Sequence, residues 1–209
     1  MSLKVYHTRI SRVINEKVIR FLSQDLSKTD EEIAGFFEVD RTAIVHMRRK
    51  YGICKGETVG EKGERMALDE LRKRGFEVKD MNAHNKLSPF DLLVDHSFRV
   101  EVKTATYNPD FKRFTFAISE RAETGVLESE TRFKLPSGRL RKDFSKTCDV
   151  LIFVGLRENK TTYYVIPSNV FPKTVSTFSI SESGKEYEEY REAWDYIKLK
   201  TRPSGRMDA

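Results

Sequence analysis

The sequence contains few cysteines and no long apolar run. Only two of its 209 residues are cysteine, Cys54 and Cys148, and they stand far apart without a partner pattern, so neither a disulfide framework nor a cysteine-based zinc site is expected. No apolar stretch approaches the roughly 20 residues of a membrane-spanning helix, and the N-terminus lacks the apolar core of a signal peptide. These absences predict a soluble, cytoplasmic protein.

Charge and length leave several classes of protein open. Lysine and arginine outnumber aspartate and glutamate by 38 to 32, and the formal net charge is +6. A basic balance suits a polyanionic partner such as DNA, although many soluble proteins are mildly basic. The length suits one sizeable domain or two small ones.

The segment 89–103 predicts a β-hairpin. Both of its halves are rich in aliphatic and aromatic residues, and the polar stretch Asp95-His96-Ser97 between them suits a short turn. A fold about His96 pairs apolar residues on one face: Phe90 with Val102, Leu92 with Val100, and Val94 with Phe98. One face of the hairpin is therefore suited to packing on a core.

Charged residues converge on the other face of this hairpin. Asp91 faces Glu101, and Lys103 lies on the same side because strand side chains alternate with period two. Like charges that face each other destabilise a sheet. A hard cation such as Mg²⁺ removes that conflict, since it binds one or two carboxylates together with waters and phosphate oxygens. Such an ion activates water for phosphodiester cleavage, and Lys103 is suited to orienting or deprotonating the water or neutralising the transition state.

A simpler interpretation of the same residues is a solvated hairpin. Glu101 and Lys103 would then form only a surface ion pair, worth at most about 1 kcal/mol. The pattern Glu-x-Lys is common by chance. The cross-strand register of Asp91 and Glu101 favours the functional interpretation.

These residues resemble a known nuclease family. Asp91, nine intervening residues and then Glu101-Val102-Lys103 are similar to the motif of the PD-(D/E)XK nuclease superfamily, which includes type II restriction enzymes and archaeal Holliday junction resolvases. One departure is that Pro89 lies two residues before Asp91 instead of next to it. The resemblance covers roughly residues 60–171. It implies a restriction-endonuclease-like α/β core, a mixed central β-sheet flanked by helices, and Mg²⁺-dependent cleavage of DNA in which Mn²⁺ substitutes.

A helix predicted over 61–74 carries a further candidate residue, Glu64. The apolar stripe of this helix consists of Ala67, Leu68 and Leu71. Glu64 shares that face, and an inward carboxylate needs a partner. In the family that the sequence resembles, a glutamate on the helix before the core sheet often helps to bind metal, and Glu64 matches it. Alternatively, Glu64 interacts with the helix dipole or pairs with Arg65 or Lys62.

Further strands are predicted before and after the hairpin, at 76–79, 113–118, 149–155 and 162–167. The continuous apolar run 149–155 is expected for a central strand covered on both faces. With the next strand, which ends in Ile166-Pro167-Ser168, it also resembles the back half of the nuclease core. A last helix is predicted at 184–198. The nuclease domain is therefore expected over 60–199, followed by a flexible tail at 200–209.

The long polar connection 119–147 is the least informative part of the sequence. A connection of this length in a compact domain is functional or partly mobile. Its basic residues either follow a nucleic-acid backbone or belong to a solvated charged loop. They are Lys134, Arg139, Arg141, Lys142 and Lys146.

Three short helices are predicted in a separate N-terminal domain, residues 1–55. The first covers 10–22, where apolar residues recur at helical spacing. The second begins at Thr29, where Thr29-Asp30-Glu31-Glu32 has the form of a capping box. Asp40 is suited to cap the third, at 41–51. The tight turn between the last two helices resembles a helix-turn-helix module, in which the N-terminal residues of the last helix meet base edges.

The predicted DNA contacts all lie on that last helix. The residues expected to face bases are Arg41, Thr42 and His46. The residues expected to contact phosphates are Arg48, Arg49 and Lys50. Phosphate contacts position a protein on DNA but carry no information about the base sequence. Alternatively, the basic helix docks on the catalytic domain or on a partner protein.

Together these features predict a metal-dependent DNA endonuclease. Asp91 and Glu101 would hold Mg²⁺, Glu64 would assist, and Lys103 would help to activate water. A homodimer is expected, because a symmetric pair of sites is the simplest way to cut both strands of a duplex. A Holliday junction resolvase-like nuclease is the alternative within the enzyme class. A DNA-binding regulator without cleavage is the alternative outside it, although the intact Asp91, Glu101 and Lys103 argue against it.

Overall fold

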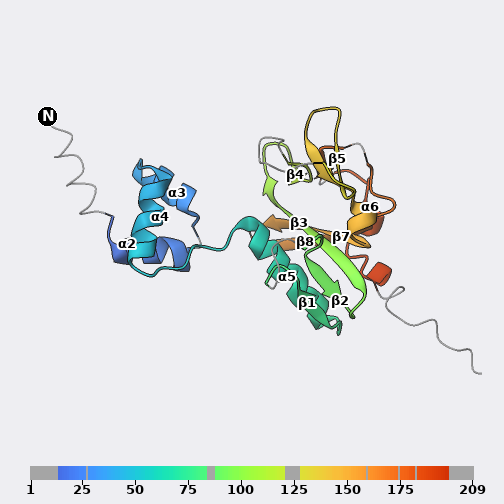
Figure 1. Cartoon of the computed structure of the whole chain (residues 1–209), viewed down its shortest axis with the longest axis horizontal. Helices are drawn as coiled ribbons and strands as arrows, with labels where there is room; N and C mark the ends of the chain where they lie inside the picture. The colour runs from blue at the N-terminus through green and yellow to red at the C-terminus, as the bar shows by residue number, and fades with distance from the viewer. Residues whose placement is uncertain are drawn as a thin grey trace, which may run out of the picture. The chain divides into compact units, whose positions relative to one another are not determined.

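The computed structural model describes residues 14–26, 28–83, 88–120, 128–158, 160–173, 175–181 and 183–197 (Figure 1). The predicted tail at 200–209 and the start of the first predicted helix lie outside these residues. The chain divides into two compact units, 1–61 and 62–209, so the division falls in the first turn of a helix. No helix in the described ranges is long and apolar enough to cross a membrane.

The N-terminal unit is helical. Its elements are α2 (Glu16–Arg20), the π-helix η1 (Phe21–Asp25), α3 (Asp30–Phe37) and α4 (Arg41–Lys50). The capping box predicted for α3 is confirmed, since the Thr29 hydroxyl accepts from the Glu32 N–H and the Glu32 carboxylate accepts from the Thr29 N–H at 2.8 Å. The Asp40 carboxylate caps α4 by accepting from the Thr42 N–H at 2.7 Å. A small core joins these helices, made of Ile14, Ile19, Ile33, Ala34, Ile44 and Ile53.

The second unit is built on a seven-stranded mixed sheet. Its strands are β1 (Val78–Asp80), β2 (Leu92–Val94), β3 (Phe98–Asn108), β4 (Arg113–Ala117), β7 (Val150–Arg157), β8 (Lys160–Pro167) and β9 (Thr177–Ser181). The order β1-β2-β3-β4-β9 is antiparallel, whereas β7 pairs with β3 in parallel and with β8 antiparallel. The predicted hairpin register is confirmed for the two strands β2 and β3, where Leu92 faces Val100 and Val94 faces Phe98.

Helix α5 (Val59–Lys73) packs on one face of this sheet, beside β1 and β2 (Figure 1). Its buried residues Ala67, Leu68 and Leu71 form, with Val100 and Val102 of β3, what we term the α5 core. The helix approaches β3 closely at Gly63, where an added Cβ would lie only 2.7 Å from the Thr104 Cβ. Glycine is therefore required there, and it fixes the position of the neighbouring Glu64.

The opposite face of the sheet carries a second core, termed the aromatic core. Its rings come from β4, β7, β9 and the segment after β8, and they include Phe114, Phe116, Phe153, Phe171 and Phe178. Residues 150–156 of β7 are all buried, so the prediction of a central strand covered on both faces is confirmed. Strand β9, which the sequence analysis missed, alternates buried Phe178 and Ile180 with exposed neighbours.

The polar connection 119–147 contains more structure than predicted. It forms a small two-stranded sheet from β5 (Arg132–Lys134) and β6 (Leu140–Lys142), followed by α6 (Phe144–Thr147). Buried Leu135, Leu140 and Phe144 attach it to the unit. Residues 121–127 lie outside the described part. The strands are too short for their alternation to be recognised in the sequence.

The predicted last helix at 184–198 is wrong over most of its length. Among residues 184–197, which the structure describes, only the 3-10 turn η3 (Glu188–Tyr190) and a single turn at 195–197 are helical. Left-handed backbone at Tyr187 and Glu192, with φ of 67° and 51°, interrupts the helix. The helix is predicted from a stripe formed by Tyr187, Tyr190, Trp194 and Ile197. In the structure these side chains separate, because Tyr187 packs on the aromatic core and Trp194 lies in the α5 core.

Candidate active site

Asp91 lies immediately before β2, and its carboxylate is held by two donors. One oxygen accepts from the backbone N–H of Val102 at 2.7 Å, and the other accepts from the Asn82 amide at 3.0 Å. The Asp91 carboxylate thus accepts the hydrogen bond from the Val102 N–H that a backbone carbonyl of β2 would accept if the strand extended further. The predicted pairing of Phe90 with Val102 is therefore wrong, and Phe90 packs with the aromatic core while Val102 lies in the α5 core.

Glu101, on β3, is fully buried and is bound by two lysines. Lys103 Nζ lies 2.7 Å from Glu101 Oε1, and Lys142 Nζ lies 3.0 Å from both carboxylate oxygens. Burial alone would raise the pKa of Glu101, but the charges of Lys103 and Lys142 outweigh that effect and lower it. The solvated-hairpin interpretation is thereby excluded, because a buried charge of this kind needs the pairing that it receives.

Lys103 is a cation in this arrangement. Burial would lower the pKa of its ammonium, but the carboxylates of Glu101 and Asp91 raise it well above the usual value. In this arrangement its ammonium donates a hydrogen bond to Glu101 and neutralises negative charge. Of the roles predicted for Lys103, orienting water and neutralising a transition state fit the geometry better than deprotonation.

Glu64, on α5, joins the same cluster through a shared amide. The Asn82 side chain donates to Glu64 Oε2 at 3.0 Å as well as to Asp91. Burial and the charge of Asp91 raise the pKa of Glu64, and burial and the charge of Glu101 raise that of Asp91. Arg65, one alternative partner for Glu64, lies 3.7 Å from Asp69. The carboxylates therefore carry mutual repulsion that a cation would relieve.

The chemistry of this cluster fits a hard metal ion, but its present geometry is not a finished metal site. Carboxylate oxygens are the donors that Mg²⁺ prefers. Within the ranges that the structure describes, however, no three histidine, cysteine, aspartate or glutamate side chains converge closely enough to hold a metal. Glu101 is turned toward its lysines. The residues that would hold a cation are Asp91 and Glu101, and both oxygens of Glu101 are bound by lysine in this structure.

Lys142 is the site residue that the sequence analysis missed. It was grouped with the basic residues of the connection 119–147, yet from β6 its ammonium reaches Glu101 and also donates to the Pro89 carbonyl at 3.2 Å. Forty-one positions separate Lys142 from Glu101. No spacing rule links two residues so far apart, so only the fold brings them together.

Comparison with known proteins adds evidence about the fold. No family model and no curated protein matches the chain. Among the solved structures that match is that of the bacterial homing endonuclease I-Ssp6803I, and the match covers 68% of this chain and 92% of that chain with a TM-score of 0.51 and 18% sequence identity. The fold is nuclease-like. At this identity the likeness describes the fold and leaves the roles of individual residues to the geometry.

Arg48 is expected on the outer face of α4, but its side chain points inward. Its guanidinium binds Asp30 with two hydrogen bonds of 2.8 and 3.0 Å and donates to the Ile53 carbonyl at 3.1 Å. Only 14% of its side chain is exposed. The prediction that Arg48 faces outward, toward phosphates, is therefore wrong, because the first turn of α3 places the carboxylate of Asp30 beside its guanidinium. Arg48 ties α3 to α4.

The other predicted DNA-contacting residues lie on the exposed surface of α4. They are Arg41, Thr42, His46, Arg49 and Lys50. Arg41 pairs with Glu31 at 3.5 Å, and both side chains are well exposed. The Thr42 hydroxyl donates to the capping carboxylate of Asp40. Their contact with DNA stays a prediction.

Two arginines of the connection 119–147 are also directed inward. Arg141 donates to the carbonyls of Pro172 and Val175 at 2.6 and 2.9 Å and lies over the rings of Phe144 and Phe171. Burial lowers its pKa to about 10. Arg139 donates to the Ser119 carbonyl at 2.8 Å. The hypothesis that this whole basic set follows a nucleic-acid backbone is therefore wrong for Arg141, which is buried. For Arg139, which is half-buried, it stays a prediction.

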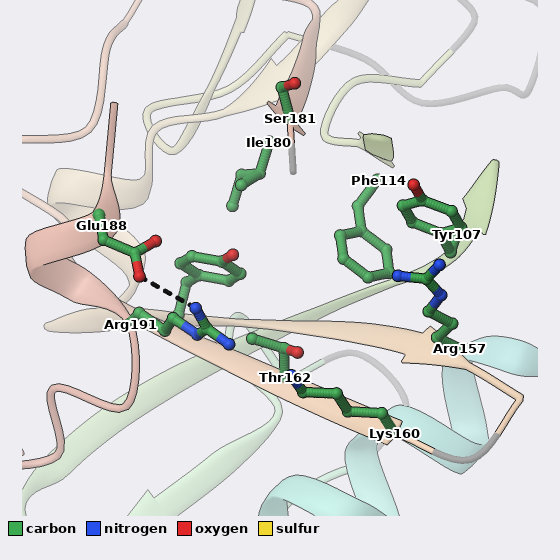
Figure 2. Close-up of a pocket in the computed structure, with 10 residues that line it drawn as sticks. Tyr107, Phe114, Arg157, Lys160, Thr162, Ile180, Ser181, Glu188 and Arg191 are labelled. Carbon is green, nitrogen blue, oxygen red and sulfur yellow. Dashed lines mark hydrogen bonds and ion pairs between the residues drawn. The ribbon is translucent and has the colours of Figure 1, made fainter. Parts of the chain in front are cut away.

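A separate basic pocket lies at the far end of the strands that carry the site (Figure 2). Arg157 stacks over Tyr107 at 4.2 Å on one side, and Arg191 pairs with Glu188 at 3.0 Å on the other. The cavity measures about 80 Å³, which is small beside the ~300–1,000 Å³ of typical small-molecule sites. None of the predicted site residues lines it, so it is distinct from the cluster around Glu101.

Proposed function

We propose that the protein is a metal-dependent DNA endonuclease of the PD-(D/E)XK type. The observation that carries this proposal is the meeting of Glu64 on α5, Asp91 immediately before β2, and Glu101 and Lys103 on β3 in one largely buried cluster, in which Asp91 interacts electrostatically with both Glu101 and Lys103. A site with three carboxylates, of which Glu64 and Asp91 have raised pKa values, costs stability, which favours a functional origin. The nuclease-like fold supports the same conclusion.

In this proposal each residue has a distinct role. Asp91 and Glu101 hold the Mg²⁺ or Mn²⁺ ion, and Glu64 assists through the amide that it shares with Asp91. The metal supplies activation of the attacking water and stabilisation of charge on the phosphate. Lys103, as a cation, orients the water and neutralises the negative charge that develops on the phosphoryl oxygens.

We further propose that the N-terminal unit binds duplex DNA through the exposed face of α4. Its first turn offers Arg41 and Thr42 to base edges, followed by His46, and its last turn offers Arg49 and Lys50 to phosphates. Two copies of the chain would cut the two strands. The helical unit favours a duplex substrate over a branched one.

Cleavage assays on the full chain test this proposal. Supercoiled plasmid, linear duplex and a synthetic four-way junction are incubated with Mg²⁺, Mn²⁺ or a chelator. We expect duplex cleavage that needs the metal, that is lost in Glu101→Gln and Lys103→Met, and that persists in Glu189→Gln, which alters an exposed glutamate of the same unit.

Two results would count against parts of the proposal. If the wild type binds duplex but cuts no substrate with either metal, the protein is a DNA-binding regulator and not a nuclease. If it cuts only the junction, the enzyme class stands and the duplex specificity is wrong.

A further inference from the structure

The binding of one carboxylate by two ammonium groups is the least expected feature of the site. A single lysine at 2.7 Å already satisfies the charge of Glu101. The second, Lys142, lies 3.0 Å from each carboxylate oxygen. An ammonium equidistant from both oxygens occupies the side of the carboxylate from which a cation would also approach.

The two lysines differ in their attachment to the site. Lys103 stands on β3 itself, two residues from Glu101, so its position follows from the strand. Lys142 stands on β6, in the separate two-stranded sheet, and it reaches Glu101 from outside the main sheet. Its second acceptor is the carbonyl of Pro89, beside Asp91. A flexible four-carbon side chain allows this ammonium to move while β6 stays in place.

The charges of the cluster also favour replacement of the Lys142 ammonium by a metal ion on Glu101. The cluster holds three carboxylates, Glu64, Asp91 and Glu101, and two lysines. A divalent cation between Asp91 and Glu101 would lie beside the Lys142 ammonium, and like charges at such short range repel strongly in a buried site. Lys142 and the metal are therefore alternatives on Glu101, whereas a metal and a phosphodiester together can accommodate Lys142 as a phosphate ligand.

We propose that Lys142 occupies the cation position on Glu101 in the metal-free protein and that metal binding displaces it toward the phosphate of the bound DNA. This inference rests on the proposed function, and it assigns Lys142 two effects of opposite sign. Lys142 weakens metal binding in the absence of DNA, and it strengthens the hold on DNA once the metal has bound. A purely structural lysine would have neither effect.

Calorimetric titration of the full chain without DNA separates these possibilities. Mn²⁺ and the non-catalytic ion Ca²⁺ are titrated into wild type, Lys142→Met and Lys134→Met, the last altering an exposed lysine of the same two-stranded sheet. We expect Lys142→Met to bind metal about tenfold more tightly than wild type, and Lys134→Met to bind it with unchanged affinity. Lys142→Gln, which keeps a hydrogen-bonding side chain, covers the case in which Lys142→Met does not fold, and should bind metal equally tightly.

Single-turnover cleavage at saturating metal provides the second measurement. Lys142→Met and Lys142→Gln should cut DNA about tenfold or more slowly, despite their tighter metal binding. Equal metal affinity in wild type and both variants, with wild-type cleavage intact, would overturn the inference and leave the proposed function standing. Absence of metal binding and cleavage in every protein would overturn the proposed function and this inference with it.

Discussion

Each unit of the protein contains a buried carboxylate bound by a basic residue for which a nucleic-acid contact is one of the interpretations that the sequence allows. In the helical unit Asp30 is bound by Arg48, and in the sheet unit Glu101 is bound by Lys142. The planar guanidinium of Arg48 meets both oxygens of Asp30 at 2.8 and 3.0 Å, and one cation neutralises one carboxylate. Glu101 has two cations of its own and two further carboxylates nearby.

The difference teaches how to tell a structural pair from a functional one. Asp30 and Arg48 satisfy each other completely and join two helices, so nothing in their surroundings calls for a ligand. Around Glu101, lysines exceed what one carboxylate needs, and the pKa values of Asp91 and Glu64 are raised by burial and by neighbouring negative charges. The charges in this cluster are therefore incompletely neutralised, and the ion pairs can rearrange when a cation or an anion binds.

The largest expected effect is on catalysis at Glu101. Glu101→Gln keeps the size of the side chain and a hydrogen-bond acceptor for the lysines, but it removes the charge that would hold a metal. We expect the DNA cleavage rate to fall at least about a thousandfold, equivalent to ~4 kcal/mol of transition-state stabilisation, with circular dichroism unchanged. Asp30→Asn should leave the intrinsic cleavage rate at saturating DNA unaltered, and an equal loss in both would remove the distinction between the two carboxylates.

Changes to the Asp30–Arg48 pair of the helical unit should alter the stability of the protein and not its cleavage rate. Arg48→Met leaves the Asp30 carboxylate buried without its partner, so the free energy of unfolding of this unit should fall by about 3 kcal/mol. Urea denaturation followed by circular dichroism measures it. Arg49→Met, at the neighbouring exposed position, should keep full stability and weaken duplex binding, most at low salt. Stability that is equal in both variants would contradict the structural role of Arg48.

Two glycines extend the comparison to the helices of the two units. Gly63→Ala forces α5 away from Thr104, so we expect a loss of about 1–3 kcal/mol in the free energy of unfolding and a slower cleavage rate, because Glu64 follows the helix. Gly35 of α3 has no atom within 4 Å of an added Cβ, so Gly35→Ala should stabilise the protein by about 0.5–1 kcal/mol. Thermal unfolding of both variants tests the pair.

The smallest effect is expected at an exposed carboxylate that also binds a lysine. Glu61 accepts from Lys55 Nζ at 2.6 Å and from the Thr58 N–H at 2.8 Å, and these contacts, Lys55 first, lower its pKa to about 2. A lowered pKa stabilises the fold above the unfolded-state value, and the contribution disappears as pH falls toward 2. Because 46% of the Glu61 side chain is exposed, solvent screening limits the contribution of this ion pair to the free energy of unfolding.

Glu61→Gln should therefore cost only about 0.5–1 kcal/mol at neutral pH. The difference in unfolding free energy between wild type and this variant should shrink as the pH approaches 2. Denaturation series at several pH values measure it. A difference that does not depend on pH would show that the charge of Glu61 contributes nothing.

Local pattern was enough to predict the hairpin of β2 and β3. Alternation with period two fixes which side chains share a face, so the pairs Leu92–Val100 and Val94–Phe98 could be predicted without tertiary information. The same alternation wrongly predicts a pair of Phe90 with Val102, because the sequence does not reveal that the Asp91 carboxylate, and not a backbone carbonyl, accepts from the Val102 N–H. The caps of α3 and α4 were predictable for the same reason, since each depends on residues three or fewer positions apart.

Contacts between distant segments were not predictable. Nothing in the pattern of the connection 119–147 distinguishes Lys142, which binds Glu101, from the exposed Lys134. The aromatic stripe at 184–198 suggested a helix because its spacing suits one, but the two cores draw Tyr187 and Trp194 to opposite faces of the sheet. Strand β9 differs from these cases, because the alternation of Phe178 and Ile180 with polar neighbours is a local pattern that indicates a strand.

The amide of Asn82 has a consequence for how the chain tolerates change. Its nitrogen donates one hydrogen to Glu64 and the other to Asp91, both at 3.0 Å, so one rigid planar group sets the spacing between a helix and a strand. Asn82 lies two residues after the end of β1. A change at Asn82 would therefore act on both carboxylates at once, because the same side chain donates to each of them.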